Sequence, residues 1–131
     1  MQRSPDHVSG RDTRPAPLDG RRLCSGTDAL VQLMLRQQAL DRAAGLDTAG
    51  FVSGYRGSPL SGVDLAMWRA SRELAAAAIR FEPGLNEELA ATAVWGTQQI
   101  EAFGRPRCQG VYALWYGKNP GLERFGDVLK H

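Results

Sequence analysis

The stretch that decides the fold is Ala49-Gly-Phe-Val-Ser-Gly-Tyr-Arg-Gly-Ser-Pro59. Residues 49–53 form a short apolar run, which predicts a buried strand, and residues 54–59 predict a glycine-rich turn that leaves it. Similar apolar runs predict further strands at 79–81 and 110–115. Helical spacing predicts helices over 27–44, 62–77 and 87–102. Because helices and strands alternate along the chain, we expect an α/β fold with a parallel sheet flanked by helices.

Each predicted helix has a cap or an apolar stripe that the sequence suggests. Thr27 is the expected N-cap of the first helix, Gly45 its C-cap, and Asn86 the N-cap of the third. The expected stripes are Leu30, Leu33, Met34, Gln37 and Leu40 in the first helix, Leu65, Trp68 and Arg72 in the second, and Leu89, Ala93, Gly96 and Ile100 in the third. Small and apolar residues fill the third helix, so we expect it to be buried. Another helix is expected to begin near Asp127.

Composition and charge fit one ordinary globular domain. The chain has 131 residues, 43% hydrophobic and 23% charged, and no apolar run long enough for a membrane span. Residues 1–22 hold five arginines and three aspartates, which account for the whole net charge of +2. Prolines and glycines punctuate this segment, so we expect a disordered arm at 1–22 and a folded body at 23–131. A neutral body argues against a nucleic-acid partner.

The two cysteines, Cys24 and Cys108, lie far apart and form no metal-ligand spacing. Lone thiols fit a reducing compartment, and the N-terminus has no apolar segment typical of a secretory signal. The expected location is therefore cytoplasmic.

Three loops should meet at the carboxyl edge of the sheet, where open α/β sheets bind ligands: 54–62, 82–87 and 116–126. In the first, Gly54 and Gly57 would let backbone approach a ligand, and Arg56 and Ser58 offer polar groups. The simpler interpretation is a tight strand-to-helix turn. The turn at 54–59 lacks the GxGxxG pattern of a dinucleotide-binding loop. It matches the GXXG pattern of nucleic-acid-binding KH loops, but four residues are a very weak match. Lys118 could face an anion, although a solvated lysine is the commoner case.

Glu87 and Glu88 begin the third helix. Carboxylates in a first turn usually stabilise the helix dipole, by about 0.3–1 kcal/mol. At the mouth of a buried helix, however, a carboxylate is desolvated and needs a proton or a specific partner. His7 and His131 have no base or nucleophile at a readable spacing, so no triad is assigned.

Three motifs together resemble the indolepyruvate ferredoxin oxidoreductase family, most closely its long single-chain bacterial form. They are Phe51-Val-Ser-Gly-Tyr-Arg-Gly-Ser-Pro-Leu60, Asn86-Glu-Glu-Leu-Ala-Ala-Thr-Ala-Val-Trp-Gly-Thr-Gln-Gln99 and Leu114-Trp-Tyr-Gly-Lys-Asn-Pro-Gly121, followed by Gly126-Asp127 and Lys130-His131. That family belongs to the thiamine-diphosphate-dependent 2-oxoacid:ferredoxin oxidoreductases. The resemblance covers residues 23–131 and implies the start of a pyrimidine-binding α/β domain.

The resemblance also implies site residues. Glu87 matches the glutamate that hydrogen-bonds N1′ of the cofactor's aminopyrimidine and so activates the thiazolium carbon. Gly54, Tyr55, Arg56, Gly57, Ser58 and Pro59 match the loop beside the thiazolium and the substrate, and Thr27 matches a Gly-Thr segment at the first helix. The complete enzyme would decarboxylate a 2-oxo acid, pass electrons through 4Fe-4S clusters to ferredoxin and transfer the acyl group to coenzyme A.

The sequence also departs from the family's pattern. Ser61 and Asn119 stand where glycines are expected, and Phe125 stands where a small residue is expected. If the backbone at position 61 or 119 requires a positive φ, the residue that replaces glycine there would be strained. The ligands for diphosphate–Mg²⁺, the clusters and coenzyme A are not found within the 131 residues, so we expect a truncated domain that is inactive alone. A complementing chain or a homodimer is a possible partner, and no membrane or nucleic acid is expected. The alternative is a non-catalytic α/β binding or remnant module.

Overall fold

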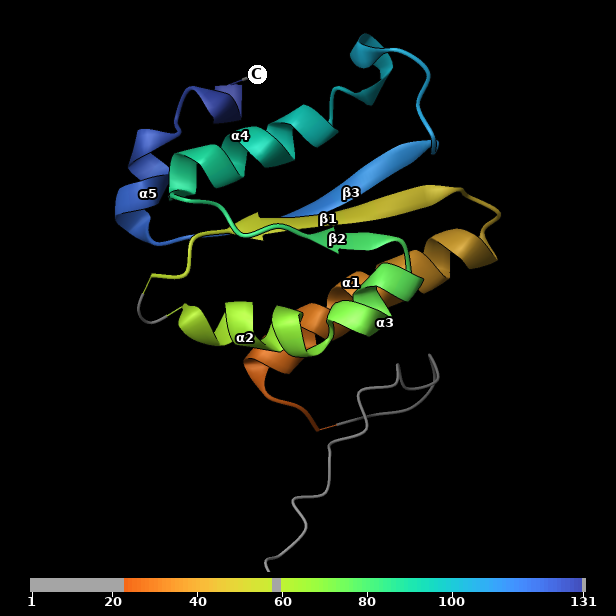
Figure 1. The fold of residues 1–131 in the computed structure, drawn as a ribbon, viewed down its shortest axis with the longest axis horizontal. Coiled ribbons are helices and arrows are strands. Elements are labelled where there is room, and N and C mark those ends of the chain that lie inside the picture. The colour runs from red at the N-terminus through yellow and green to blue at the C-terminus, as the bar shows by residue number, and fades with distance from the viewer. Residues whose placement is uncertain (1–22, 58–59, 131) are drawn as a thin grey trace, which may run out of the picture.

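The computed structural model describes residues 23–57 and 60–130 (Figure 1). The arm predicted at 1–22 lies outside the described residues. In the described part, three parallel strands form one sheet in the order β2-β1-β3, with helices on both faces. The predicted α/β class with a parallel sheet is therefore confirmed.

The ends of the strands fall within one residue of their predicted positions. They are β1 (Thr48–Gly54), β2 (Ile79–Phe81) and β3 (Gly110–Tyr116). On one face lie α1 (Gly26–Ala43), α2 (Ser61–Arg69) and α3 (Ser71–Ala76). The other face carries α4 (Glu87–Thr97), α5 (Asn119–Arg124) and the short 3-10 helices η1 (Ile100–Phe103) and η2 (Val128–Lys130). The main core lies between the sheet and the α1–α3 layer, where Val52, Met67 and Leu74 are buried.

Helix α1 has the predicted extent but a different cap and a different buried face. Its N-cap is Ser25, whose hydroxyl accepts a hydrogen bond from the Asp28 N–H at 3.2 Å, so Thr27 as the cap was wrong. The C-cap is Ala44, one residue before the predicted Gly45, which follows it with φ of +76°, the left-handed conformation common for a glycine just after a helix.

The buried residues of α1 are Val31, Met34, Leu35 and Gln38. The predicted stripe was wrong in part, because Leu33 and Leu40 are about half exposed and Gln37 is exposed. The polar interruption is Gln38 instead, whose amide N–H donates to the Thr48 carbonyl at 2.9 Å. This bond satisfies a side chain that is only 2% exposed.

The helix predicted over 62–77 is two helices that meet at Ala70. Ala70 is buried, with φ of −90° and ψ of 11°, and its backbone ends α2 and begins α3. The inward residues are Val63, Asp64, Ala66, Met67, Ala70 and Leu74. The predicted stripe of Leu65, Trp68 and Arg72 is therefore the exposed side.

Helix α4 is capped by Asn86 as predicted, with the Leu89 N–H donating to Asn86 Oδ1 at 2.8 Å. It is shorter than predicted and is not a buried helix. Ala90 and Ala91 are buried against the sheet, whereas Leu89 and Ala93 are exposed. The expectation near Asp127 is met only by the 3-10 turn η2, and α5 occupies part of what was predicted as a loop.

Candidate functional site

The loops after the three strands converge at the carboxyl edge of the sheet, as predicted. The Tyr55 N–H donates to the Tyr116 carbonyl at 3.3 Å, which joins the loop after β1 to the end of β3. The Gly84 N–H donates to the Gly54 carbonyl at 2.9 Å, which joins the loop after β2 to the end of β1. The first residues of α4 therefore stand at this edge, directly after the loop that follows β2 and in contact with the segment that follows β3.

Glu87 is enclosed on one side by glycines from the segment after β3. A Cβ added to Gly121 would lie 2.5 Å from Glu87 Cβ and 2.6 Å from Glu87 Cδ, and one added to Gly117 would lie 3.2 Å from Glu87 Cγ. The indole N–H of Trp115 donates to the Glu87 backbone carbonyl at 3.3 Å. The Glu87 side chain therefore packs directly on the backbone of Gly117 and Gly121, and a Cβ at position 121 would collide with it while one at position 117 would crowd it.

The carboxylate of Glu87 remains available for a ligand. Glu87 is half-buried, and within the described part of the chain its carboxylate accepts no hydrogen bond and forms no ion pair. Glu88, the next residue, is exposed, as expected of a residue that acts only on the helix dipole. Of the two first-turn glutamates, Glu87 is the one that packs against the segment after β3.

Gly121→Ala should therefore destabilise the protein by about 2 kcal/mol, because the methyl group overlaps the Glu87 side chain and the backbones must separate. The matched control is Gly96→Ala. Gly96 also lies in a helix, and its added Cβ would meet nothing within 4 Å, so alanine should raise stability by roughly 0.5–1 kcal/mol. Urea unfolding measures both. Equal effects of the two substitutions would mean that Gly121 does not hold Glu87.

The glycine-rich loop is only partly described, since Ser58 and Pro59 lie outside the described residues. Tyr55 and Arg56 are exposed. The Lys118 side chain lies over Gly57, because a Cβ on that glycine would be 2.9 Å from Lys118 Cε. In the described residues neither Arg56 nor Lys118 forms an ion pair, so two cations stand free at this edge.

Gly54 is needed for packing within the protein. Its Cβ would lie 2.5 Å from the Tyr116 ring and would overlap the Tyr116 carbonyl oxygen. The glycine thus permits contact between β1 and Tyr116, and no room for a ligand is visible at that position.

Thr27 lies near the loop after β1, and the three residues that depart from the family's pattern fit the structure without strain. A Cβ on Gly62 would lie 3.5 Å from Thr27 Cγ2, which places Thr27 beside the end of the loop. Ser61 and Asn119 begin helices, and the one non-glycine residue with positive φ in the described residues is Ala78, so neither replacement is strained. Phe125 is buried and packs edge-to-face on Trp115, with the ring centroids 4.4 Å apart.

A buried polar pair that was not predicted from the sequence lies beneath this edge. The Tyr116 hydroxyl donates a short hydrogen bond to Oδ1 of Asp64, which is 4% exposed. Oδ2 of Asp64 is buried and has no partner among the described residues. Burial, and then the bond to Asp64 and its charge, raise the pKa of Tyr116 far above its ordinary value of 10.

A second tyrosine of β3, Tyr112, also bonds to the α1–α3 layer, and its pKa is raised less than that of Tyr116. The Tyr112 hydroxyl lies 2.9 Å from Gln38 Oε1 and 3.0 Å from the Met34 carbonyl oxygen. Burial, together with the charge of Asp41, raises the pKa of Tyr112 to about 12. Both tyrosines link the sheet to the α1–α3 layer, but Tyr112 binds neutral acceptors.

In the described ranges no helix is both long and apolar enough to cross a membrane, and no three His, Cys, Asp or Glu side chains gather as metal ligands. Comparison with protein-family models, with curated proteins and with solved structures found no match.

Proposed function

We propose that this chain supplies the cofactor-activating glutamate of a thiamine-diphosphate-dependent 2-oxoacid:ferredoxin oxidoreductase of the indolepyruvate type. The observation that carries the proposal is the setting of Glu87. Its carboxylate has no partner among the described residues, and its side chain lies at the carboxyl edge of the sheet, packed against Gly117 and Gly121 of the segment after β3. Glu87 belongs to one of the three motifs that carry the resemblance, and Gly117 and Gly121 belong to another.

The residues present fit the aminopyrimidine end of the cofactor. Glu87 would accept or share the proton at N1′, through a charge-assisted hydrogen bond that half-burial strengthens. As the resemblance implies, Thr27 and the exposed Tyr55 and Arg56 of the loop after β1 would lie beside the thiazolium and the substrate. When bound, the cofactor would supply the thiazolium carbon that adds to the carbonyl of a 2-oxo acid before decarboxylation.

This chain's share of the proposed enzyme is limited to that end. We assign the ligands for the diphosphate, Mg²⁺ and the iron–sulfur clusters to polypeptide outside these 131 residues, together with the sites for coenzyme A and ferredoxin. Glu87 would thus hold a proton and orient the aminopyrimidine ring, while oxidation and acyl transfer would occur elsewhere. The chain should show no turnover by itself.

Thiamine diphosphate with Mg²⁺ should raise the melting temperature of the full chain, because a ligand that binds only the folded state stabilises it. Glu87→Gln should weaken this binding by at least about tenfold, since the charged acceptor is lost. Glu88→Gln is the matched control, one residue away in the same helix turn but exposed, and should bind as the wild type does.

The alternative, a non-catalytic α/β module, predicts a different pattern in the same titration. The wild-type melting temperature would then be unchanged by saturating cofactor, or the shift would be the same in both glutamine variants. An equal shift in the two glutamine variants would contradict the proposed role of Glu87, and an unchanged wild-type melting temperature would favour the non-catalytic module.

A further inference from the structure

The outer edge of β2 presents backbone groups that no described strand pairs. The Gly50 N–H donates to the Ala78 carbonyl, and the Glu82 N–H donates to the Val52 carbonyl. Backbone groups alternate in direction along a strand, so residues 78, 80 and 82 face β1 and the N–H and C=O of Phe81 face outward. Figure 1 shows β2 at one side of the sheet, with no described strand beyond it.

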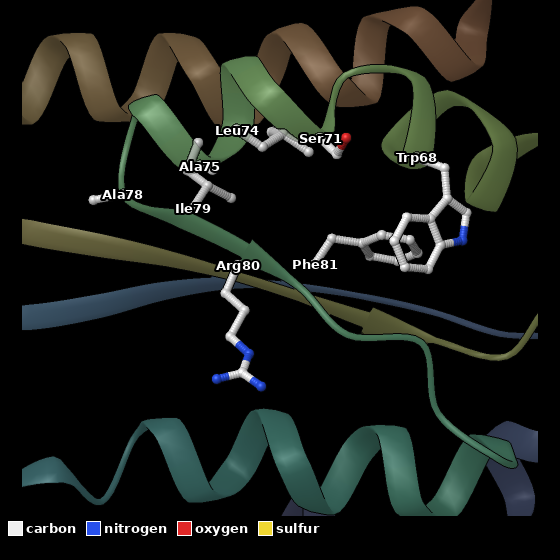
Figure 2. Close-up of a pocket in the computed structure, with 8 residues that line it drawn as sticks. All are labelled: Trp68, Ser71, Leu74, Ala75, Ala78, Ile79, Arg80 and Phe81. Atoms are coloured by element: carbon white, nitrogen blue, oxygen red, sulfur yellow. The ribbon is translucent and has the colours of Figure 1, made fainter.

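An apolar hollow lies along this edge on the α2–α3 side. Its volume is about 400 Å³, and Trp68, Leu74, Ile79 and Phe81 are among the residues that line it (Figure 2). Trp68 packs edge-to-face on Phe81, with ring centroids 5.1 Å apart, and is still 54% exposed. A large aromatic surface beside an open strand edge is typical of an interaction site.

The other side of the same edge is charged. The Arg80 side chain points away from the aromatic pair, toward the α4 side (Figure 2). It bonds Glu82 at 2.8 Å, and the two side chains are 76% and 56% exposed. Thus β2 offers one cation and one anion, two residues apart, with Phe81 between them.

We propose that this edge pairs antiparallel with β2 of a second copy of the chain, in the register centred on Phe81. In that register Arg80 stands opposite Glu82 of the second copy, and Glu82 opposite its Arg80. A register centred on Arg80 or on Glu82 would instead place like charges opposite one another, which is destabilising. Among the registers centred on residues 80, 81 and 82, the charge pattern therefore favours the one centred on Phe81, in which the edge is complementary to itself.

The backbone and the aromatic side chains favour the same register. Because the Phe81 N–H and C=O both face outward, the two copies of Phe81 would exchange two hydrogen bonds. Residues directly opposite in an antiparallel pair lie on the same face of the sheet, so both Phe81 rings and both Trp68 rings would meet on the α2–α3 side. This inference does not depend on the proposed function.

A charge-exchange experiment on the full chain tests the pairing. Sedimentation velocity over a range of concentrations should show a reversible monomer–dimer equilibrium for the wild type. Arg80→Glu or Glu82→Arg alone should weaken dimerisation at least about tenfold, since each creates two like-charge pairs across the interface. The double variant Arg80→Glu/Glu82→Arg should restore it. All of these side chains are exposed, so the variants should fold, which circular dichroism verifies.

A cross-link tests the register itself. Phe81→Cys, with Cys24 and Cys108 replaced by serine, should form an intermolecular disulfide on mild oxidation, because opposite Cα atoms at about 5.5 Å suit that bond. Leu65→Cys, on the outward side of α2, is the control and should not cross-link. A wild type that stays monomeric, a double variant no better than the single ones, or equal cross-linking at both positions would overturn the proposal.

Discussion

Gly54→Ala should cost about 3 kcal/mol of folding free energy, because it forces a methyl group into a filled space. The added Cβ would lie 2.5 Å from the Tyr116 ring and would overlap the Tyr116 carbonyl oxygen. The carbonyl cannot move aside, since it accepts the Tyr55 N–H that joins two loops of the site. The strands must therefore separate at the end of the sheet that carries Glu87.

Urea unfolding followed by circular dichroism measures this loss. Gly62→Ala is the matched control, because its Cβ would make only an ordinary contact of 3.5 Å with Thr27 Cγ2. Gly62 begins a helix, so alanine there should be neutral or stabilising. If Gly54→Ala were as stable as Gly62→Ala, the close packing of Tyr116 on β1 would be wrong.

The strands could be predicted because their signals are local. Residues 49–53 are apolar and end at Gly54, and parallel strands buried on both faces are expected to be continuous apolar runs. Asn86 and Gly45 could also be located, because each acts on backbone within one helix turn. The position of Glu87 at the sheet edge follows from these same local signals.

The buried helix faces could not be predicted, because they depend on how each helix docks on the sheet. Leu33 and Leu40 are exposed while Gln38 is buried, since Gln38 finds the Thr48 carbonyl of β1. The break at Ala70 has no proline or glycine to announce it. Helix α5 was missed because Asn119-Pro-Gly121 is typical of a loop, although proline also suits a first helical turn.

Asp64 had a signal that could have been used. It follows Val63 and precedes Met67 by three residues, so it lies on the same inward stripe of α2 as these two buried side chains. A charged residue on an apolar stripe needs a buried partner. That partner, Tyr116, is 52 residues away in the sequence. Its identity therefore could be found only from the tertiary structure.

Tyr116→Phe should cost about 3 kcal/mol, because it leaves a buried carboxylate with no hydrogen bond from any described residue. Tyr112→Phe makes the same chemical change on the same strand. Its acceptors, Gln38 and the Met34 carbonyl, are neutral, so the expected cost is only about 1 kcal/mol. The difference between the two variants in urea unfolding isolates the effect of the charge.

The double variant Tyr116→Phe/Asp64→Leu should recover most of the loss, because replacing both partners leaves no buried polar group unsatisfied. Recovery tests the pairing, since independent sites would give additive losses. No recovery would mean that Asp64 serves another partner.

The cost of Tyr116→Phe should also fall as the pH rises above about 10. In the unfolded chain Tyr116 ionises near its ordinary pKa of 10, whereas burial and the bond to Asp64 raise the pKa in the folded protein. Above pH 10 the unfolded wild type therefore holds fewer protons than the folded form, and its stability declines. The phenylalanine variant lacks this contribution and keeps that of Tyr112, whose folded pKa is about 12. A constant difference between wild type and variant from pH 8 to pH 11 would show that the Tyr116 hydroxyl is not buried against Asp64.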